Sequence, residues 1–200
     1  LQGRQKNQVF PNPTRSSETT PLKTAAVLTC LAEAVPPDTF RPGYCDREKR
    51  RLHRAREIHW DRLPTVKPTA SAPPLAKMER VFQRPWIDHV YDWSSREVHP
   101  SENMPGYGRE VGRAVSIGGL LLCCDYSREE KAKLCVGMIQ VGIDNWSVAQ
   151  HGKHKEAGGW PAAGGFGNGR KFPILLAAIL LDDKRMANIE KYAPETCFGE

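Results

Sequence analysis

The sequence predicts an all-α fold built from antiparallel helical hairpins. Three long segments with helical or continuously apolar character follow one another in residues 110–192. No stretch of the chain alternates apolar and polar residues as a half-buried strand would. Short turns or a glycine-rich loop join the three segments, and short connections favour antiparallel neighbours.

The N-terminal part divides into a lead-in and the start of a domain. Residues 1–24 are polar and interrupted by prolines, which predicts an extended lead-in, and residues 25–200 are expected to form one α-helical domain. The domain is expected to begin with a short helix over residues 24–34. Pro36 and Pro37 would end it, because the residue before a proline disfavours the helical conformation.

A basic segment comes next. Asp46 is expected to cap a helix that reaches about Leu63, and acidic residues are interleaved at helical spacings with the arginines of residues 47–62. This mixture indicates a solvated helix face rather than a nucleic-acid footprint. The proline-rich residues 64–74 read as a connector, after which a helix is expected over residues 75–82.

The three long helices make up the rest. They are expected over residues 110–125, from Ser127 to about Gly152, and over residues 172–192 with a break near Asp182 and Asp183. Ser127 and Glu130 match a capping box, which marks the start of the second helix. That helix is apolar almost all round, so it should be buried.

A glycine-rich loop is expected before the last helix, and it contains Gly164, Gly165, Gly167 and Gly169. Glycines let a backbone approach another surface closely. The loop ends on Arg170 and Lys171, followed by Pro173 in the first helical turn and an apolar run over residues 174–181 that should be covered on all sides. Free amides and two cations at a helix start would stabilise an anionic group. The alternative is a structural loop between helices with solvated basic residues.

Composition excludes several classes of function. The 200 residues carry a formal net charge of +6, a mild excess that is spread along the chain, so no nucleic-acid partner is expected. The six cysteines form no CxxC pair, and no nucleotide-binding or hydrolase motif is present, so neither a metal nor a cofactor is expected. The longest apolar run is far shorter than the ~20 residues that cross a bilayer.

Four polar residues precede the first long helix within eleven positions: His99, Asn103, Tyr107 and Arg109. A tyrosine or histidine can exchange a proton, while asparagine and arginine can stabilise charge that develops on a carboxylate. The set therefore suits proton abstraction next to a carboxylate. Tyr107 and His99 could equally be half-buried residues bonded to the backbone.

The second long helix contains Asp144, Asn145 and Trp146, and buried Asp or Asn requires partners. A structural ion pair between Asp144 and Arg170 is favoured over a role in lining a cavity. Trp146 and Trp160 could stack on sugar rings or pack in the core.

Four segments carry a family resemblance: RPWIDHV, HPSENMPGYGREV, QVGID and WPAAGGFGNGRKFPILLAAILLDD. Over residues 25–190 they resemble a family of bacterial proteins related to α/α-toroid polysaccharide lyases and heparinase-like proteins. The resemblance implies that the chain is the N-terminal part of an incomplete α/α toroid. It also implies a secreted or periplasmic protein whose cleft takes an acidic polysaccharide.

The activity that this resemblance implies is β-elimination on a uronic acid. Tyr107 or His99 would act as base or acid, with Asn103 and Arg109 neutralising the carboxylate. Substrate contacts would come from Trp146, Trp160, Asn168, Arg170 and Lys171. Phe166 stands where relatives carry histidine, which puts activity in doubt.

Two other functions remain open. One is a non-catalytic helical protein that binds a carbohydrate or another anion or serves as a scaffold. The other is an α/α-toroid glycoside hydrolase, which would need two carboxylates across a cleft. The sequence leaves the oligomeric state open.

Overall fold

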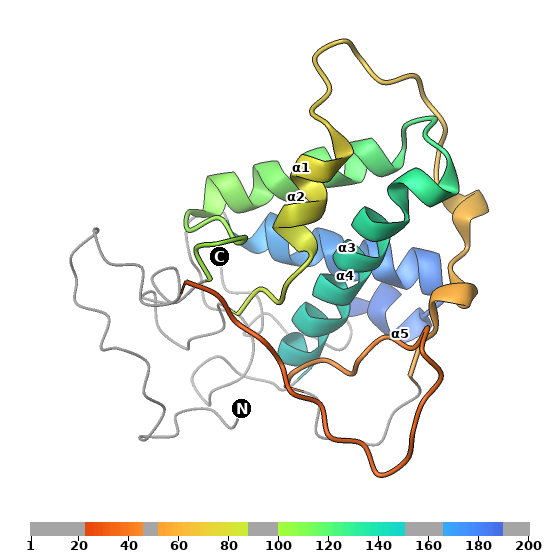
Figure 1. Cartoon of the computed structure of the whole chain (residues 1–200), viewed down its shortest axis with the longest axis vertical. Helices are drawn as coiled ribbons and strands as arrows, with labels where there is room; N and C mark the ends of the chain where they lie inside the picture. Colours follow the sequence, from red (N-terminus) through yellow and green to blue (C-terminus); the bar gives the residue numbers. More distant parts are fainter. Residues whose placement is uncertain (1–22, 46–51, 88–99, 151–165, 190–200) are drawn as a thin grey trace, which may run out of the picture.

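The computed structural model describes residues 23–45, 52–87, 100–150 and 166–189. These residues form an all-α fold (Figure 1), as the sequence predicts, with two isolated β-bridges and no strand in the ranges just given. The elements are the 3₁₀ helices η1 (Ala55–Glu57) and η2 (Trp60–Arg62) and the α-helices α1 (Leu75–Phe82), α2 (Gly108–Leu122), α3 (Arg128–Ala149), α4 (Phe166–Leu181) and α5 (Lys184–Ala187). No helix among the described residues is long and apolar enough to cross a membrane.

Helix α3 lies at the centre of the bundle. It packs against α1, α2 and α4, and α4 also packs against α2 (Figure 1). Leu134, Cys135, Met138 and Ile139 of α3 are completely buried. The C-terminal half of α3 is buried on nearly every side, so the expectation of a buried helix is confirmed for that half, whereas Arg128, Lys133 and Val136 of the first half are exposed.

Glycines lie where the helices cross most closely. A Cβ built on Gly142 of α3 would stand 2.1 Å from the carbonyl oxygen of Pro173 in α4. One built on Gly137 would stand 2.7 Å from the carbonyl oxygen of Phe82 in α1. These contacts bring α3 against the backbone of both neighbours, an approach that any larger side chain would prevent.

The predicted start of α3 and the break after α4 are both confirmed. The Ser127 hydroxyl accepts a hydrogen bond from the Glu130 N–H (3.2 Å), and the Glu130 carboxylate accepts one from the Ser127 N–H (2.7 Å). After α4 the chain turns at Asp182, whose φ of 54° is left-handed. Asp183 then caps α5, because its carboxylate accepts hydrogen bonds from two N–H groups of the first turn.

Two predicted N-terminal helices do not form in the parts of them that the structure describes. Residues 24–34 are irregular and largely exposed, because a short helix is marginal in water without tertiary packing. Residues 52–63 contain only η1 and η2, because their backbone pairs with an earlier segment: the Phe40 N–H donates to the His53 carbonyl (2.9 Å), and the Ala55 N–H donates to the Asp38 carbonyl (2.7 Å). The expected capping residue Asp46 and most of the lead-in lie outside the described residues.

The last long helix also differs from its prediction. It begins at Phe166, so the second part of the expected glycine loop is helical and Pro173 lies inside α4 instead of in its first turn. Packing explains this difference, since a Cβ on Gly169 would stand 2.6 Å from a methyl group of Val111 in α2. The apolar run is not covered on all sides either, because Leu175 is 37% exposed and Ile179 is 51% exposed.

Candidate functional site

Two of the predicted catalytic residues lie where α2 begins. Tyr107 immediately precedes α2, is 52% exposed, and provides no side-chain cap for the first turn. The Arg109 guanidinium lies 5.5 Å from the centre of the Tyr107 ring, and its Nε donates to the Glu110 carboxylate (3.0 Å). Both side chains are open to solvent, and the charge of Arg109 is shared with Glu110.

Asn103 has a different environment, because it is buried against the end of α1. Its Nδ2 donates to the carbonyl oxygens of Val81 and Arg84, both at 3.1 Å. The Trp86 indole also donates to the Val81 carbonyl (2.8 Å). Asn103 therefore holds the C-terminal end of α1, while its buried Oδ1 has no hydrogen-bond partner among the described residues.

The first turns of α4 carry three of the predicted substrate contacts. Asn168 and Lys171 are exposed, whereas Arg170 is only 2% exposed. The Arg170 guanidinium lies 4.6 Å from the centre of the buried Phe166 ring. The basic pair of the sequence is thus divided between the interior and the surface.

The starts of α2 and α4 lie at the same end of the bundle (Figure 1). The contact between Gly169 and Val111 fixes this arrangement, because it joins the first turns of the two helices. The structure thereby brings Tyr107 and Arg109 to the same end as Asn168 and Lys171, a grouping that their distance in sequence does not reveal. His99 and Trp160 lie outside the described residues, and Trp146 is buried in the core.

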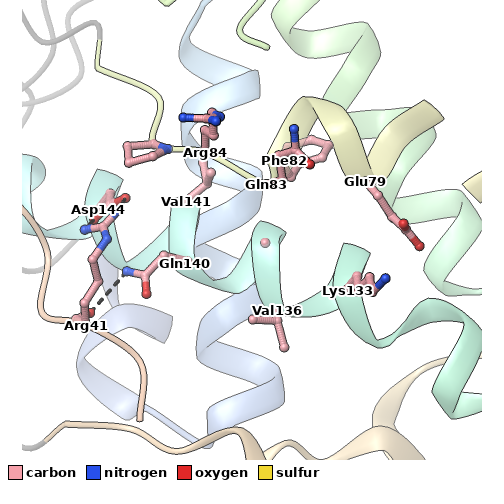
Figure 2. Close-up of a pocket in the computed structure, with 12 residues that line it drawn as sticks. Arg41, Glu79, Phe82, Gln83, Arg84, Lys133, Val136, Gln140, Val141 and Asp144 are labelled. Atoms are coloured by element: carbon pink, nitrogen blue, oxygen red, sulfur yellow. Dashed lines mark hydrogen bonds and ion pairs between the residues drawn. The ribbon is translucent and has the colours of Figure 1, made fainter. Parts of the chain in front are cut away.

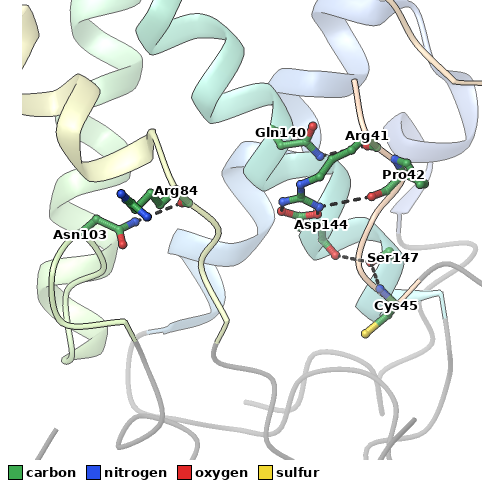
Figure 3. A network of polar contacts seen from close by, with 8 residues as sticks. All are labelled: Arg41, Pro42, Cys45, Arg84, Asn103, Gln140, Asp144 and Ser147. Atoms are coloured by element: carbon green, nitrogen blue, oxygen red, sulfur yellow. Dashed lines mark hydrogen bonds and ion pairs between the residues drawn. The ribbon is translucent and has the colours of Figure 1, made fainter. Parts of the chain in front are cut away.

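Asp144 pairs with Arg41 and not with the expected Arg170. The Arg41 guanidinium contacts both oxygens of the Asp144 carboxylate, as Figure 3 shows. Gln140 donates from its side chain to the Arg41 carbonyl (3.1 Å). Burial raises the pKa of Asp144 to about 6, although Arg41 acts to lower it. The expected pair with Arg170 is therefore wrong: Asp144 forms its buried ion pair with Arg41, and it also lines a pocket.

Asn145 is buried against the part of α4 that contains its proline. Pro173 has no N–H, so the Gly169 carbonyl four residues earlier lacks its usual helical partner. The Asn145 side chain donates to the next carbonyl, that of Arg170 (3.1 Å), from a fully buried position. A buried amide in α3 thus joins α3 to the backbone of α4 close to the proline.

A pocket of about 430 Å³ lies between α1, α3 and the segment that contains Arg41 (Figure 2). Its lining is both charged and apolar, and it comprises Arg41, Glu79, Phe82, Gln83, Arg84, Pro85, Lys133, Val136, Gly137, Gln140, Val141 and Asp144. Sequence reasoning missed this site. The one available signal was a buried aspartate that required a cation, and the sequence offered several arginines as partners.

Comparison with known proteins finds no matching family, no similar curated protein and no similar solved structure. Among the residues that the structure places, no group of three or more histidine, cysteine, aspartate or glutamate side chains is arranged to hold a metal ion.

Proposed function

We propose that the chain binds an acidic polysaccharide at the end of the bundle where α2 and α4 begin, as part of a lyase-like carbohydrate-active protein with an α/α-toroid architecture. One observation carries this proposal: Tyr107, Arg109, Asn168 and Lys171 are all exposed on the adjoining starts of two helices. The positive ends of two helix dipoles, Lys171, and Arg109, whose charge Glu110 shares, together favour carboxylate groups.

The exposed tyrosine is the residue best suited to the chemical step. In β-elimination a base removes the proton at C5 of a uronic acid, the C4–O4 bond breaks, and a double bond forms between C4 and C5. The leaving oxygen receives a proton. Tyr107 is the candidate for the proton transfers, and Arg109, 5.5 Å from its ring, is the candidate for neutralising the carboxylate.

A non-catalytic binding protein is the second candidate, and two contacts favour it. The Asn103 amide donates its hydrogen bonds to two carbonyl groups at the end of α1, so it is not free to neutralise a substrate carboxylate. Phe166 is buried beneath the Arg170 guanidinium. Two positions that lyase-like chemistry would use are thus occupied by packing.

Binding and turnover separate the two candidates. Purified protein is mixed with polygalacturonate, alginate and heparin, and binding is measured together with the ultraviolet absorbance of the unsaturated product. If the chain is lyase-like, the Tyr107→Phe variant is expected to lose turnover but still to bind the polymer. In the binding protein, no polymer yields product and Tyr107→Phe leaves the affinity unchanged.

The location of the site is tested with two lysines. Lys171→Ala is expected to weaken binding and to reduce its dependence on salt. Lys184→Ala is the matched control, because Lys184 lies in α5, after the opposite end of α4. Equal effects of the two variants, or no binding of any acidic polymer, would contradict the proposal.

A further inference from the structure

The pocket between α1 and α3 is a second candidate site, separate from the starts of α2 and α4. Its volume of about 430 Å³ falls within the range of ~300–1,000 Å³ that small-molecule sites occupy. One side is a face of α3 on which Lys133, Val136, Gly137 and Gln140 succeed one another at helical spacing. The other side is the C-terminal part of α1 and the residues that follow it.

The two ends of the pocket differ in charge. Glu79 and Lys133 lie towards one end, where their charges balance, and the Arg41–Asp144 pair lies at the other (Figure 2). Arg84 is on the side of the Arg41–Asp144 pair in this view. Because Asp144 is neutralised by Arg41, Arg84 leaves this end with one net positive charge.

Arg84 is available to a ligand. Its guanidinium donates to the Thr24 hydroxyl (3.2 Å), and within the described part of the chain it forms no ion pair. Its side chain is exposed, although it lines the pocket. An arginine without a carboxylate partner beside a concave surface is suited to bind an anionic group.

The C-terminal end of α1 repels an anion less than an uncapped helix end would. Helix C-termini carry partial negative charge on unpaired carbonyl groups. Here the Val81 carbonyl accepts hydrogen bonds from both Trp86 and Asn103, and the Arg84 carbonyl accepts one from Asn103. These donors offset part of the negative charge that would otherwise face the ligand.

The middle of the pocket is apolar. Phe82, Val136 and Val141 line it, and Gly137 lets α1 approach α3 closely, since a Cβ there would stand 3.0 Å from the Phe82 Cβ. Val136 is still 36% exposed, so part of this surface faces the opening. Phe82 and Val141 are each only 2% exposed, so Val136 provides the apolar surface that contact with the apolar body of a ligand would bury.

We propose that this pocket binds a small organic carboxylate, with its carboxylate on Arg84 and its apolar body on Val136. The charge difference between the two ends orients the ligand. The apolar floor selects against inorganic anions, because they have no apolar group to contact it. This site is independent of the polysaccharide site proposed above.

Three probes with the same apolar body test the proposal: 4-phenylbutyrate, 4-phenylbutanol and 4-phenylbutylamine. Each is titrated into the full chain and followed by isothermal titration calorimetry and by amide chemical shifts. The carboxylate is expected to bind most tightly and to shift the amides of α1 and α3 that line the pocket. Inorganic phosphate is expected to bind more weakly than the organic acid.

Variants of exposed residues locate the carboxylate. Arg84→Gln is expected to weaken 4-phenylbutyrate binding about tenfold, the loss of one charge-assisted contact. Arg80→Gln is the matched control, because Arg80 is an exposed arginine of α1 that does not line the pocket. Val136→Asp places a carboxylate on the floor and should abolish binding without disturbing the buried core.

Several outcomes would overturn the proposal. They are equal affinity for the acid, the alcohol and the amine; phosphate binding as tightly as the organic acid; equal effects of Arg84→Gln and Arg80→Gln; and no binding of 4-phenylbutyrate at all. Circular dichroism of each variant shows whether the helices are intact, so loss of binding through unfolding is recognised.

Discussion

The crossing of α3 and α4 predicts that Gly142→Ala destabilises the protein. An added Cβ would lie 2.1 Å from the Pro173 carbonyl oxygen and 2.9 Å from the Ala177 Cβ, whereas ordinary contacts begin at 3.4 Å. Both neighbours are fixed parts of α4, so neither can turn aside as a flexible side chain would. The two helices must move apart by about 1 Å or more, and such a gap forfeits a quarter to a half of each affected contact.

The size of the effect follows from two opposing terms. Replacing glycine by alanine inside a helix stabilises it by about 1 kcal/mol. Overpacking a well-filled core costs about 1–3 kcal/mol, and contact with backbone places this case at the upper end. The expected net loss is about 2 kcal/mol, which lowers the Tm by about 4–8 °C for a chain of this size.

Gly112→Ala is the matched control for this experiment. Gly112 lies inside α2, and a Cβ built there meets no atom within 4 Å. Only the propensity term remains, so this variant should be more stable than the parent by about 1 kcal/mol. Both variants are measured by urea and thermal unfolding, and the reasoning fails if Gly142→Ala is as stable as Gly112→Ala.

Three further substitutions test buried and partly buried polar groups by urea unfolding. Asn145→Leu removes the donor to the Arg170 carbonyl and should cost about 1–3 kcal/mol, so an unchanged midpoint would show that this carbonyl finds another partner. Because burial raises the pKa of Asp144 to about 6, the contribution of this carboxyl group to the free energy of unfolding is present at low pH and falls by about 2 kcal/mol between pH 4 and pH 7. The parent should therefore lose stability relative to Asp144→Asn as pH rises. A difference in the free energy of unfolding that stays constant with pH would refute this. The His53 side chain lowers the pKa of Asp183 to about 2. The contribution of ionised Asp183 to the free energy of unfolding is therefore present above the unfolded pKa of about 3.9 and is lost as pH falls towards 2. Asp183→Asn keeps a side chain that can cap α5, and its free energy of unfolding should lack this decrease at acid pH.

The sequence was most informative where local chemistry decides the structure. The bounds of α1 agree with the prediction over residues 75–82, because a proline-rich connector delimits its start. The start of α3 was predictable from its capping box, and the break at Asp182 and Asp183 from two polar residues after an apolar run. Each of these features depends on residues that are neighbours along the chain.

Features that depend on distant partners could not be predicted in this way. Residues 52–63 do not form the predicted α-helix, because their backbone pairs with residues 38–40. No local sequence pattern predicts that pairing. Residues 166–171 are helical although they hold two glycines, because Gly169 must pack closely on Val111. Tertiary contact outweighs helix propensity in both cases.

The candidate sites show the same division. Exposed Tyr107, Arg109 and Lys171 were named from their chemistry and Asn168 from the family resemblance, and the fold groups them at one end of the bundle. The requirement for a partner at Asp144 was also predictable, but the choice of Arg41 over Arg170 was not. That choice depends on the path of the chain before α1, where the sequence wrongly predicts helices.

The C-terminal half of α3 connects the two candidate sites. Asp144 holds Arg41 at one end of the pocket, and the next residue, Asn145, holds the Arg170 carbonyl at the start of α4. Adjacent positions on a helix point in different directions, so one buried turn positions groups on two sides of the molecule. This turn also contains Gly142, which sets the distance to α4. The buried Asp144 and Asn145 therefore each have a partner, the Arg41 guanidinium and the Arg170 carbonyl, as polar groups in a core require.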